Sequence, residues 1–415
     1  MILKIKVDDL KPGMHITDLG LSPIEYPHVF HAEGVIRTVE QIAAIKQKGY
    51  TEAFVDDKKS LISIDASTGW ADLLETVQTM TQPGALASAQ PSAPLPGPEE
   101  VHEKMGKAIK LYTEAFKTTE YLFTTVGKGK PVPIQAAYDA AGNVVDSIIN
   151  DDLTLATITK LQSYDDYTFS HCVNVSVLAT LFGRHLGLDT EWLNNLAMAG
   201  MLHDIGKTVI PLKLLNTARS LKEDEFEIMK GHALAGFEVL QESQGVPKTV
   251  KLGILEHHER HNGSGYPYGK QDDEISVMGQ MLSIVDVYDA LTSKRVYKPP
   301  LMPYTAVSFI YSQRGQHFEP IMVDRFIQSI GVYPAGSVVS LNTGEIGIVY
   351  ECHTQAPLRP MVAIIMDKNG GKIPLKMINL DTPNAPSIVE CLEAYKTGIN
   401  VQAVLKACVW ANRKI

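Results

Sequence analysis

LAMAGMLHDIGKTVIP, residues 196–211, places His203, Asp204 and Lys207 at the end of an apolar run with helical spacing. A helix that buries the apolar residues would draw these polar side chains into the interior with them. Burying such groups costs several kcal/mol each unless they are paired or bound to a metal ion. The stretch therefore predicts a buried polar site inside a helical domain.

Composition limits the class of protein. The chain has 415 residues, of which 45% are hydrophobic and 20% charged, with a formal net charge of -9. This is ordinary globular composition, and the length predicts about two or three domains. An acidic chain lacks the overall positive charge that favours binding to a nucleic-acid polymer or an anionic membrane. A locally positive cleft can still bind a small phosphate ligand.

Targeting and redox signals indicate the cytoplasm. No apolar run approaches the ~18 residues that span a bilayer. The opening MILKIKVDDLKPGM reads as a strand and a turn, not as a signal peptide. The cysteines lie far apart without a CxxC pair, which favours reduced thiols; they are Cys172, Cys352, Cys391 and Cys408.

The pattern along the chain predicts a mainly α protein in four segments. Residues 1–80 alternate strand-like runs with one helix at 38–50, typical of a small α+β domain. Residues 81–100 are rich in Pro, Ala and Ser and predict a linker, with a partner-recognition segment as the alternative. Residues 101–330 have helical spacing, which predicts helices over 191–207 and 247–259 among others. Residues 331–415 predict a small β-rich appendage with a terminal helix.

Histidines and aspartates recur on the inward faces of the predicted helices. A single histidine on an apolar face is usually a core residue with a satisfied hydrogen bond. Here, however, two doublets lie on separate helices, and three further candidates lie on others. The candidate ligands are His171, His203, Asp204, His232, His257, His258 and Asp286.

The doublets favour two metal ions over one. Adjacent helix residues point about 100° apart, so a doublet reaches two neighbouring metals or places a carboxylate as a bridge. Imidazole with carboxylate suits Fe, Mn, Zn or Ni, and this many donors exceed one tetrahedral site. Two divalent metals can hold a bridging hydroxide as nucleophile and clamp a phosphate, which is the chemistry of phosphodiester hydrolysis.

A phosphate ligand also needs cations, and three lie near the predicted site. Lys207 follows His203 by about one turn, and Arg295 and Lys298 follow the Asp286 helix. Tyr266 lies in HHERHNGSGYP, where it either stacks on a base or packs the loop.

These motifs resemble the HD-GYP family of the HD superfamily of metal-dependent phosphohydrolases. The resemblance spans about residues 150–325 and includes LHDIGKTVIP, MKGHALAGFEVL, HHERHNGSGYP and IVDVYDALTSKRVYK. It implies a helical HD-type domain that hydrolyses cyclic di-GMP to pGpG or GMP. The beginning of the chain also resembles a domain of unknown function that often precedes HD-GYP domains.

The resemblance also implies roles for residues of this sequence. The seven candidates above would bind metal, with Asp204 bridging. Asp204 and Lys207 would be catalytic, Lys207, Arg295 and Lys298 would hold phosphates, and Tyr266 would contact a guanine. Tyr167 stands where some members have a glutamate for a third metal, which favours two metals.

Other functions stay open at this stage. One is a cyclic-dinucleotide receptor or signalling module with little turnover, and another is a phosphodiesterase that prefers the mixed GMP–AMP ring. The GYP segment disfavours a general nucleotide phosphohydrolase. A signalling partner or a homodimer is also left open.

Overall fold

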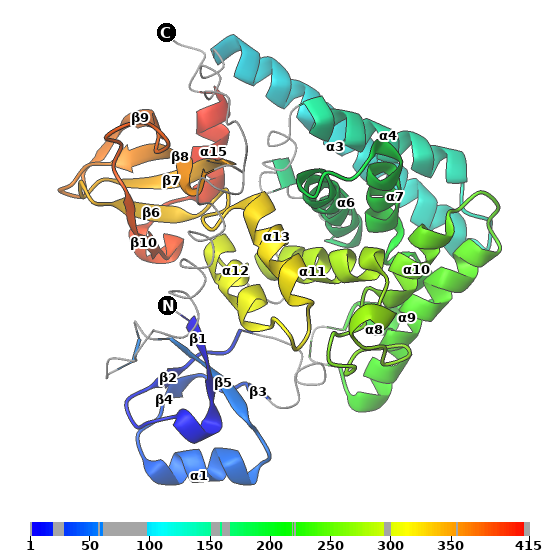
Figure 1. Cartoon of the computed structure of the whole chain (residues 1–415), viewed down its shortest axis with the longest axis horizontal. Helices are drawn as coiled ribbons and strands as arrows, with labels where there is room; N and C mark the ends of the chain where they lie inside the picture. The colour runs from blue at the N-terminus through cyan, green and yellow to red at the C-terminus, as the bar shows by residue number, and fades with distance from the viewer. Residues whose placement is uncertain are drawn as a thin grey trace.

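The computed structural model has three parts, which are a small N-terminal domain, a helical body and a C-terminal sheet (Figure 1). The structure describes residues 2–19, 29–56, 59–60, 98–150, 158–159, 167–217, 219, 221–293, 300–353 and 356–410.

The N-terminal domain is the predicted α+β unit. Its elements are β1 (Ile2–Lys6), η1 (Val7–Asp9), β2 (His15–Ile16), β3 (Val29–Phe30), β4 (Gly34–Val35), α1 (Val39–Gln47) and β5 (Glu52–Asp56). The sheet order is β1-β5-β2-β4, with β3 parallel to β5. A capping box between Thr38 and Gln41 begins α1 and satisfies backbone N–H groups that the first turn leaves unpaired.

The helical body carries most of the chain. Its elements are α3 (Pro98–Gly127), α4 (Ile134–Asn150), α6 (Tyr167–His185), α7 (Thr190–Leu202), η2 (Ile205–Val209), α8 (Leu212–Leu215), α9 (Glu223–Gln241), α10 (Lys248–Glu256), η3 (Asp272–Glu274), α11 (Val277–Thr292), α12 (Pro303–Ser312) and α13 (Pro320–Ile330). Because α3 begins at Pro98, residues 98–100 are helical and not linker. The rest of the predicted linker lies outside the described residues.

Helix α6 forms the centre of this body. Its residues from His171 to Gly183 are all buried, and it packs against α3, α4, α7, α11 and α13. A helix that is buried on every side is typical of the core of a large domain. His171, where this buried stretch begins, therefore lies in a dry environment.

Two predicted helices end earlier than expected. The helix predicted over 191–207 ends at Leu202, and Lys207 lies in η2 instead. The helix predicted over 247–259 ends at Glu256. In the first case the backbone of Gly206 turns against α9, where a Cβ would lie 1.9 Å from the carbonyl oxygen of His232. This contact redirects the chain immediately after the His-Asp pair.

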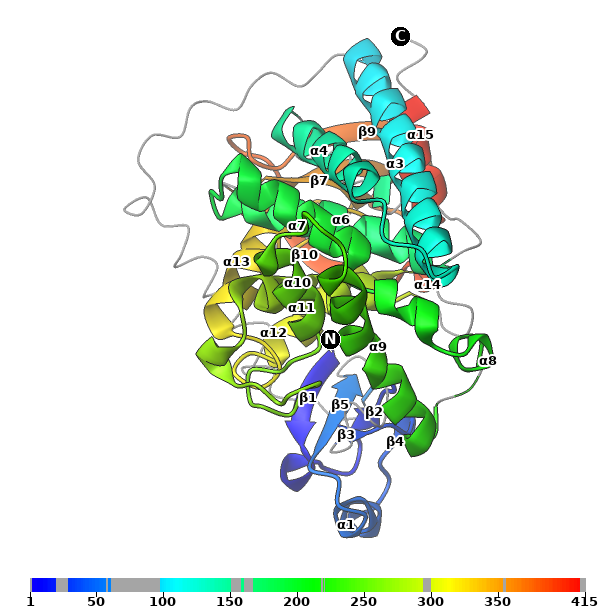
Figure 2. The same cartoon turned by 90° about the vertical axis from the view of Figure 1, so that its right-hand side faces the viewer.

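The C-terminal part is an antiparallel sheet with two helices. Its elements are β6 (Val338–Leu341), β7 (Ile346–His353), β8 (Ala356–Met366), β9 (Lys372–Asn379), β10 (Ile388–Leu392), α14 (Ala394–Thr397) and α15 (Val401–Trp410). The strand order is β10-β6-β7-β8-β9. This agrees with the predicted appendage and terminal helix. Figures 1 and 2 both place α15 beside α3, and the two helices are in contact.

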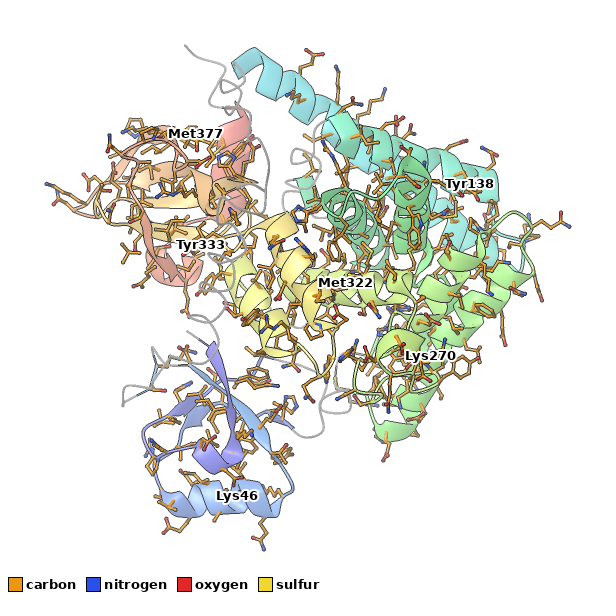
Figure 3. The ribbon with its side chains drawn as sticks, viewed as in Figure 1. Lys46, Tyr138, Lys270, Met322, Tyr333 and Met377 are labelled. Atoms are coloured by element: carbon orange, nitrogen blue, oxygen red, sulfur yellow. The ribbon has the colours of Figure 1, made fainter. Side chains whose placement is uncertain are left out.

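Apolar packing joins the three parts. Phe54 of β5 packs on Phe309 of α12 with ring centroids 5.5 Å apart. Tyr333 lies between α13 and the sheet, where Figure 3 labels it, and it belongs to the same buried cluster as the helical body. Within the described ranges, no helix is both long enough and apolar enough to cross a membrane.

The close approach at Gly206 can be tested by adding one methyl group. In Gly206→Ala the new Cβ meets the α9 backbone, so we expect about 1–3 kcal/mol of destabilisation. Gly231→Ala is the control, because Gly231 lies on α9 with nothing within 4 Å, and alanine raises helix propensity. Urea denaturation of both variants measures the difference. Equal stability of Gly206→Ala and the wild type would contradict the proposed contact.

Candidate metal centre

All seven candidate ligands meet in one place in the helical body. They come from α6, the end of α7 and the residue after it, α9, the end of α10 and α11. Six are buried and His258 is partly exposed. Six of them form two groups of three, in each of which the ligand atoms lie within 4.8 Å of one another, and Asp204 is the seventh.

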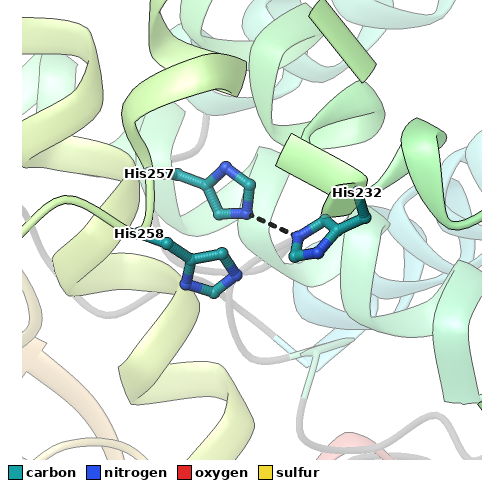
Figure 4. A group of neighbouring side chains, drawn as sticks. All are labelled: His232, His257 and His258. Atoms are coloured by element: carbon teal, nitrogen blue, oxygen red, sulfur yellow. Dashed lines mark hydrogen bonds between the residues drawn. The ribbon is translucent and has the colours of Figure 1, made fainter. Parts of the chain in front are cut away.

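The first group contains His232, His257 and His258 (Figure 4). The Nε2 atoms of His232 and His257 are 3.4 Å apart, and the rings of His257 and His258 are 4.1 Å apart between centroids. Burial lowers the pKa of His232 to about 4 and that of His257 to about 3. Neutral imidazoles with available lone pairs are what a metal ion requires.

The second group contains His171, His203 and Asp286. Nε2 of His171 lies 2.9 Å from Oδ1 of Asp286, and Nε2 of His203 lies 3.9 Å from the same oxygen. Burial alone raises the pKa of the Asp286 carboxyl, but the neighbouring His171 more than offsets it and holds the pKa well below its usual range. This group therefore combines two imidazoles with an ionised carboxylate.

Asp204 lies between the two groups. Its Oδ2 is 3.4 Å from Nε2 of His203, and its Oδ1 is 3.5 Å from Nε2 of His232. Burial opposes its ionisation, yet Lys207 and His203 hold its pKa well below the usual range. One carboxylate thus presents one oxygen to each group, as a bridging ligand does.

Backbone carbonyls orient three of the imidazoles. Nδ1 of His203, His232 and His257 donates to the carbonyl oxygen three residues earlier, at 2.8, 2.7 and 2.6 Å. A carbonyl oxygen only accepts, so the proton is on Nδ1 and the Nε2 lone pair is available to a ligand. Such outer contacts are typical of histidines that bind metal.

Two buried nitrogen atoms support the fit of a metal ion. Nε2 of His203 and Nδ1 of His258 make no hydrogen bond to any residue that the structure describes. Buried polar atoms generally find partners, and a bound ion is one explanation for those that do not. Together with the mixed imidazole and carboxylate set, this fits a transition metal. The Sγ atom of Cys172 also lies near His203 and Asp204, but burial raises the pKa of this thiol, which disfavours the thiolate.

Of the three predicted phosphate-binding cations, the structure places one. Nζ of Lys207 donates to Oδ2 of Asp204 at 2.6 Å, and 27% of its side chain is exposed. Burial alone would lower the pKa of this amine, but the carboxylate of Asp204 more than offsets it, so the pKa is raised and the amine stays charged. Arg295 and Lys298 lie outside the described residues.

Tyr266 lies at the first group of histidines. Its ring centroid is 4.7 Å from that of His258, and the amine of Lys230 lies 5.8 Å from its centre. The ring is half-buried, so part of it faces solvent beside the donor cluster.

Two buried glutamates hold the loop that carries Tyr266, and the sequence analysis missed them. Glu256 accepts from Nζ of Lys270 at 2.5 Å, and Glu259 accepts from the backbone N–H groups of Tyr268 and Lys270 at 2.8 and 3.0 Å. Their positions beside the His-His doublet were a signal for such a role. These contacts tie the stretch that follows Tyr266 to the segment that carries His257.

Asp289 is a further buried carboxylate that the sequence analysis missed. It lies three residues after Asp286 on α11. It is fully buried, and its Oδ2 lies 2.8 Å from Nδ1 of His171. The spacing in SIVDVYDAL places both aspartates on one helix face, which was the available signal.

Comparison with known proteins finds three family matches along the chain. Residues 143–322 match the family model described as "HD domain", and residues 2–137 match a "Domain of unknown function (DUF3391)". Residues 338–398 match a "KOW domain associated with HD domain". The first match covers all seven candidate ligands.

Among curated proteins, the chain is similar to three phosphodiesterases of bacteria. It is 28% identical over 385 residues to cyclic di-GMP phosphodiesterase PA4108 of Pseudomonas aeruginosa, covering 93% of this chain and 90% of that protein. It is 36% identical to the cyclic di-GMP phosphodiesterase response regulator RpfG of Xanthomonas campestris, covering 42% and 47%. It is 33% identical to the 3'3'-cGAMP-specific phosphodiesterase 2 of Vibrio cholerae, covering 39% and 31%. The chain thus spans most of the first relative and less than half of the other two.

The bridging position of Asp204 yields a prediction about metal content. Asp204→Ala removes the carboxylate that faces both groups, so we expect the metal bound per chain to fall strongly from about two, the number of a dinuclear site. Asp139→Ala is the control, because Asp139 is exposed on α4 and contacts Gln135. Elemental analysis of both proteins measures the metal content. Unchanged content in Asp204→Ala would show that this residue is not a bridge.

Proposed function

We propose that this chain, whose residues 143–322 match an HD domain and carry motifs that resemble the HD-GYP family, hydrolyses a phosphodiester bond of cyclic di-GMP. The observation that carries the proposal is the placement of Asp204, with one oxygen toward each group of imidazoles. The similarity to a cyclic di-GMP phosphodiesterase along 93% of the chain supports the substrate class.

Two divalent transition metals, Fe, Mn, Ni or Zn, are the proposed cofactors. His232, His257 and His258 would hold one, while His171, His203 and Asp286 would hold the other, with Asp204 shared. The ring of Tyr167 stacks on that of His171, with centroids 5.4 Å apart and an angle of 11° between the planes. An aromatic ring thus covers this side of His171, where a further carboxylate ligand would be needed for a third metal.

When bound, such a metal pair supplies Lewis acidity at phosphorus and lowers the pKa of an attacking water molecule. The residues of the chain orient and neutralise the substrate. Lys207 is charged, partly exposed and held beside Asp204, so its amine is placed to stabilise negative charge that develops on a phosphate oxygen. Arg295 and Lys298 are proposed to hold further phosphate oxygens.

Tyr266 is the proposed contact for a guanine base. Its half-buried ring lies beside His258, and Lys230 and Phe226 support it from α9. Because Glu256 and Glu259 fix the loop, the ring is held in place before substrate binds. A preorganised aromatic face gives affinity for a base at low entropic cost.

Cyclic di-GMP is proposed over the mixed GMP–AMP ring, since the relative that covers most of the chain is named for cyclic di-GMP. The relative named for 3'3'-cGAMP covers 39% of the chain. The proposed product is pGpG or GMP. We expect the reaction in the cytoplasm, in keeping with cysteines that form no disulfide among the described residues. The expected signalling partner or homodimer stays a prediction.

The function is tested by incubating the full chain, loaded with Mn²⁺ or Fe²⁺, with each cyclic dinucleotide in separate reactions. We expect cyclic di-GMP to be converted to the linear product, and the mixed ring to be converted more slowly. Tight binding of cyclic di-GMP without conversion under either metal would instead assign a receptor. Faster conversion of the mixed ring would reassign the substrate.

The role of Tyr266 is tested by its removal. Base stacking on an aromatic ring contributes about 1–3 kcal/mol, so Tyr266→Ala should weaken binding of cyclic di-GMP about 5- to 150-fold. Tyr268→Ala is the matched control, because that ring is 61% exposed and only its backbone N–H contacts Glu259. Steady-state KM and direct binding measure both variants. Equal effects of the two substitutions would mean that Tyr266 only packs the loop.

A further inference from the structure

His171 is oriented differently from the other candidate ligands. His203, His232 and His257 each donate Nδ1–H to a backbone carbonyl, which no side-chain substitution removes. His171 instead places Nδ1 2.8 Å from Oδ2 of Asp289. The orientation of this one imidazole therefore depends on a side chain.

Asp289 is itself held by two donors. Its Oδ1 accepts from Nδ2 of Asn174 at 3.0 Å and from Oγ of Ser293 at 2.9 Å. The carboxylate is fully buried, and Asn174 is 4% exposed. Because both oxygens accept hydrogen bonds from fixed partners, the carboxylate cannot turn away from His171 without leaving a buried donor unpaired.

A third helix continues this network. The hydroxyl of Tyr112 donates to Oδ1 of Asn174 at 2.7 Å, and Tyr112 is fully buried on α3. An amide whose oxygen accepts from Tyr112 must turn its NH₂ group toward Asp289, so the tyrosine sets the orientation of Asn174. Tyr112 lies at a position matched by the domain of unknown function, outside the residues matched by the HD domain.

We propose that Asp289 is a positioning residue for the metal site of His171, His203 and Asp286, and that Tyr112 of α3 completes its support through Asn174. The proposal rests on the metal-binding part of the proposed function. Asp289 accepts the Nδ1 proton of His171 and so directs Nε2 toward Asp286, where it would bind a metal ion once its own proton is lost. Loss of such an outer-shell partner typically costs about 10- to 100-fold in metal affinity.

The proposal predicts an effect on one metal site and not on both. In the other group, backbone carbonyls orient His232 and His257, and the ring of Tyr266 lies beside His258, so changes at Asp289 should leave this group intact. A general loss of folding would weaken both sites together. Selective weakening of one binding step is therefore the signature of positioning.

Asp289→Asn is the first test variant. The asparagine side chain has the shape of aspartate but only one acceptor oxygen. Its NH₂ group must therefore face either the Nδ1–H of His171 or the NH₂ group of Asn174. Titration of the metal-free full chain with Mn²⁺ against a competing chelator measures each binding step. We expect one step to weaken about 10- to 100-fold and the other to stay within about twofold of the wild type. Wild-type affinity at both steps would overturn the proposal.

Tyr112→Phe removes only a hydroxyl and tests the α3 contribution even if Asp289→Asn folds poorly. We expect a smaller weakening, about two- to tenfold, of the same binding step, since one neutral hydrogen bond is lost. Tyr138→Phe is the matched control, because Tyr138, labelled in Figure 3, donates to the carbonyl of Gly245 on another side of the body. Weakening of both steps, or equal effects of the two tyrosine variants, would contradict the role of Tyr112.

The metal titration contains no nucleotide. It therefore tests the positioning role of Asp289 independently of whether the chain hydrolyses cyclic di-GMP. If the wild type binds two metals and the variants lose one step, the inference stands even if no cyclic dinucleotide is hydrolysed. If the wild type hydrolyses cyclic di-GMP while both variants bind metal like the wild type, the inference fails and the proposed function survives.

Discussion

The carboxylate of Asp204, almost completely buried between the imidazoles of His203 and His232, constrains the whole helical body. An ionised carboxylate in the interior is tolerated only when positive groups, hydrogen bonds or a metal compensate for lost water. The compensating groups are Lys207 in η2, His203 directly after α7 and His232 on α9, so these elements must present their side chains to one point. The glycines follow from this requirement, because a Cβ on Gly200 would lie 2.5 Å from Cα of Ser176 and one on Gly206 would meet α9.

The sequence was most informative where metal-binding residue types occurred at positions that the helical spacing places in the interior. The seven donors were identified because polar residues recurred within apolar helical spacing, and the structure brings all of them together. The N-terminal α+β domain was predicted from alternating strand-like runs, and the C-terminal sheet from β-branched runs between turns. The ends of α7 and α10 were not predicted. At α7, the close contact of Gly206 with α9 accompanies the end of a helical pattern that continues in the sequence beyond Leu202.

The supporting residues were harder to predict because their role depends on orientation. Asp289 has the same residue type and nearly the same setting as Asp286, yet one faces the donor cluster and the other the back of His171. Tyr112 lies 59 residues before His171 and within an ordinary amphipathic helix, and only packing reveals its hydroxyl contact with Asn174. Their network means that the metal centre extends beyond the matched HD segment into α3, which also contacts α15. Helices outside that segment thus contribute to the geometry of the site.

The central claim is that hydrolysis of cyclic di-GMP depends on a dinuclear centre built on Asp204. The most direct measurement is stoichiometric reconstitution, in which the metal-free chain receives Mn²⁺ in steps while linear product is followed. The account predicts that hydrolysis rises until about two equivalents are bound and then reaches a plateau. Full hydrolysis without added metal, or none after two equivalents are bound, would contradict it.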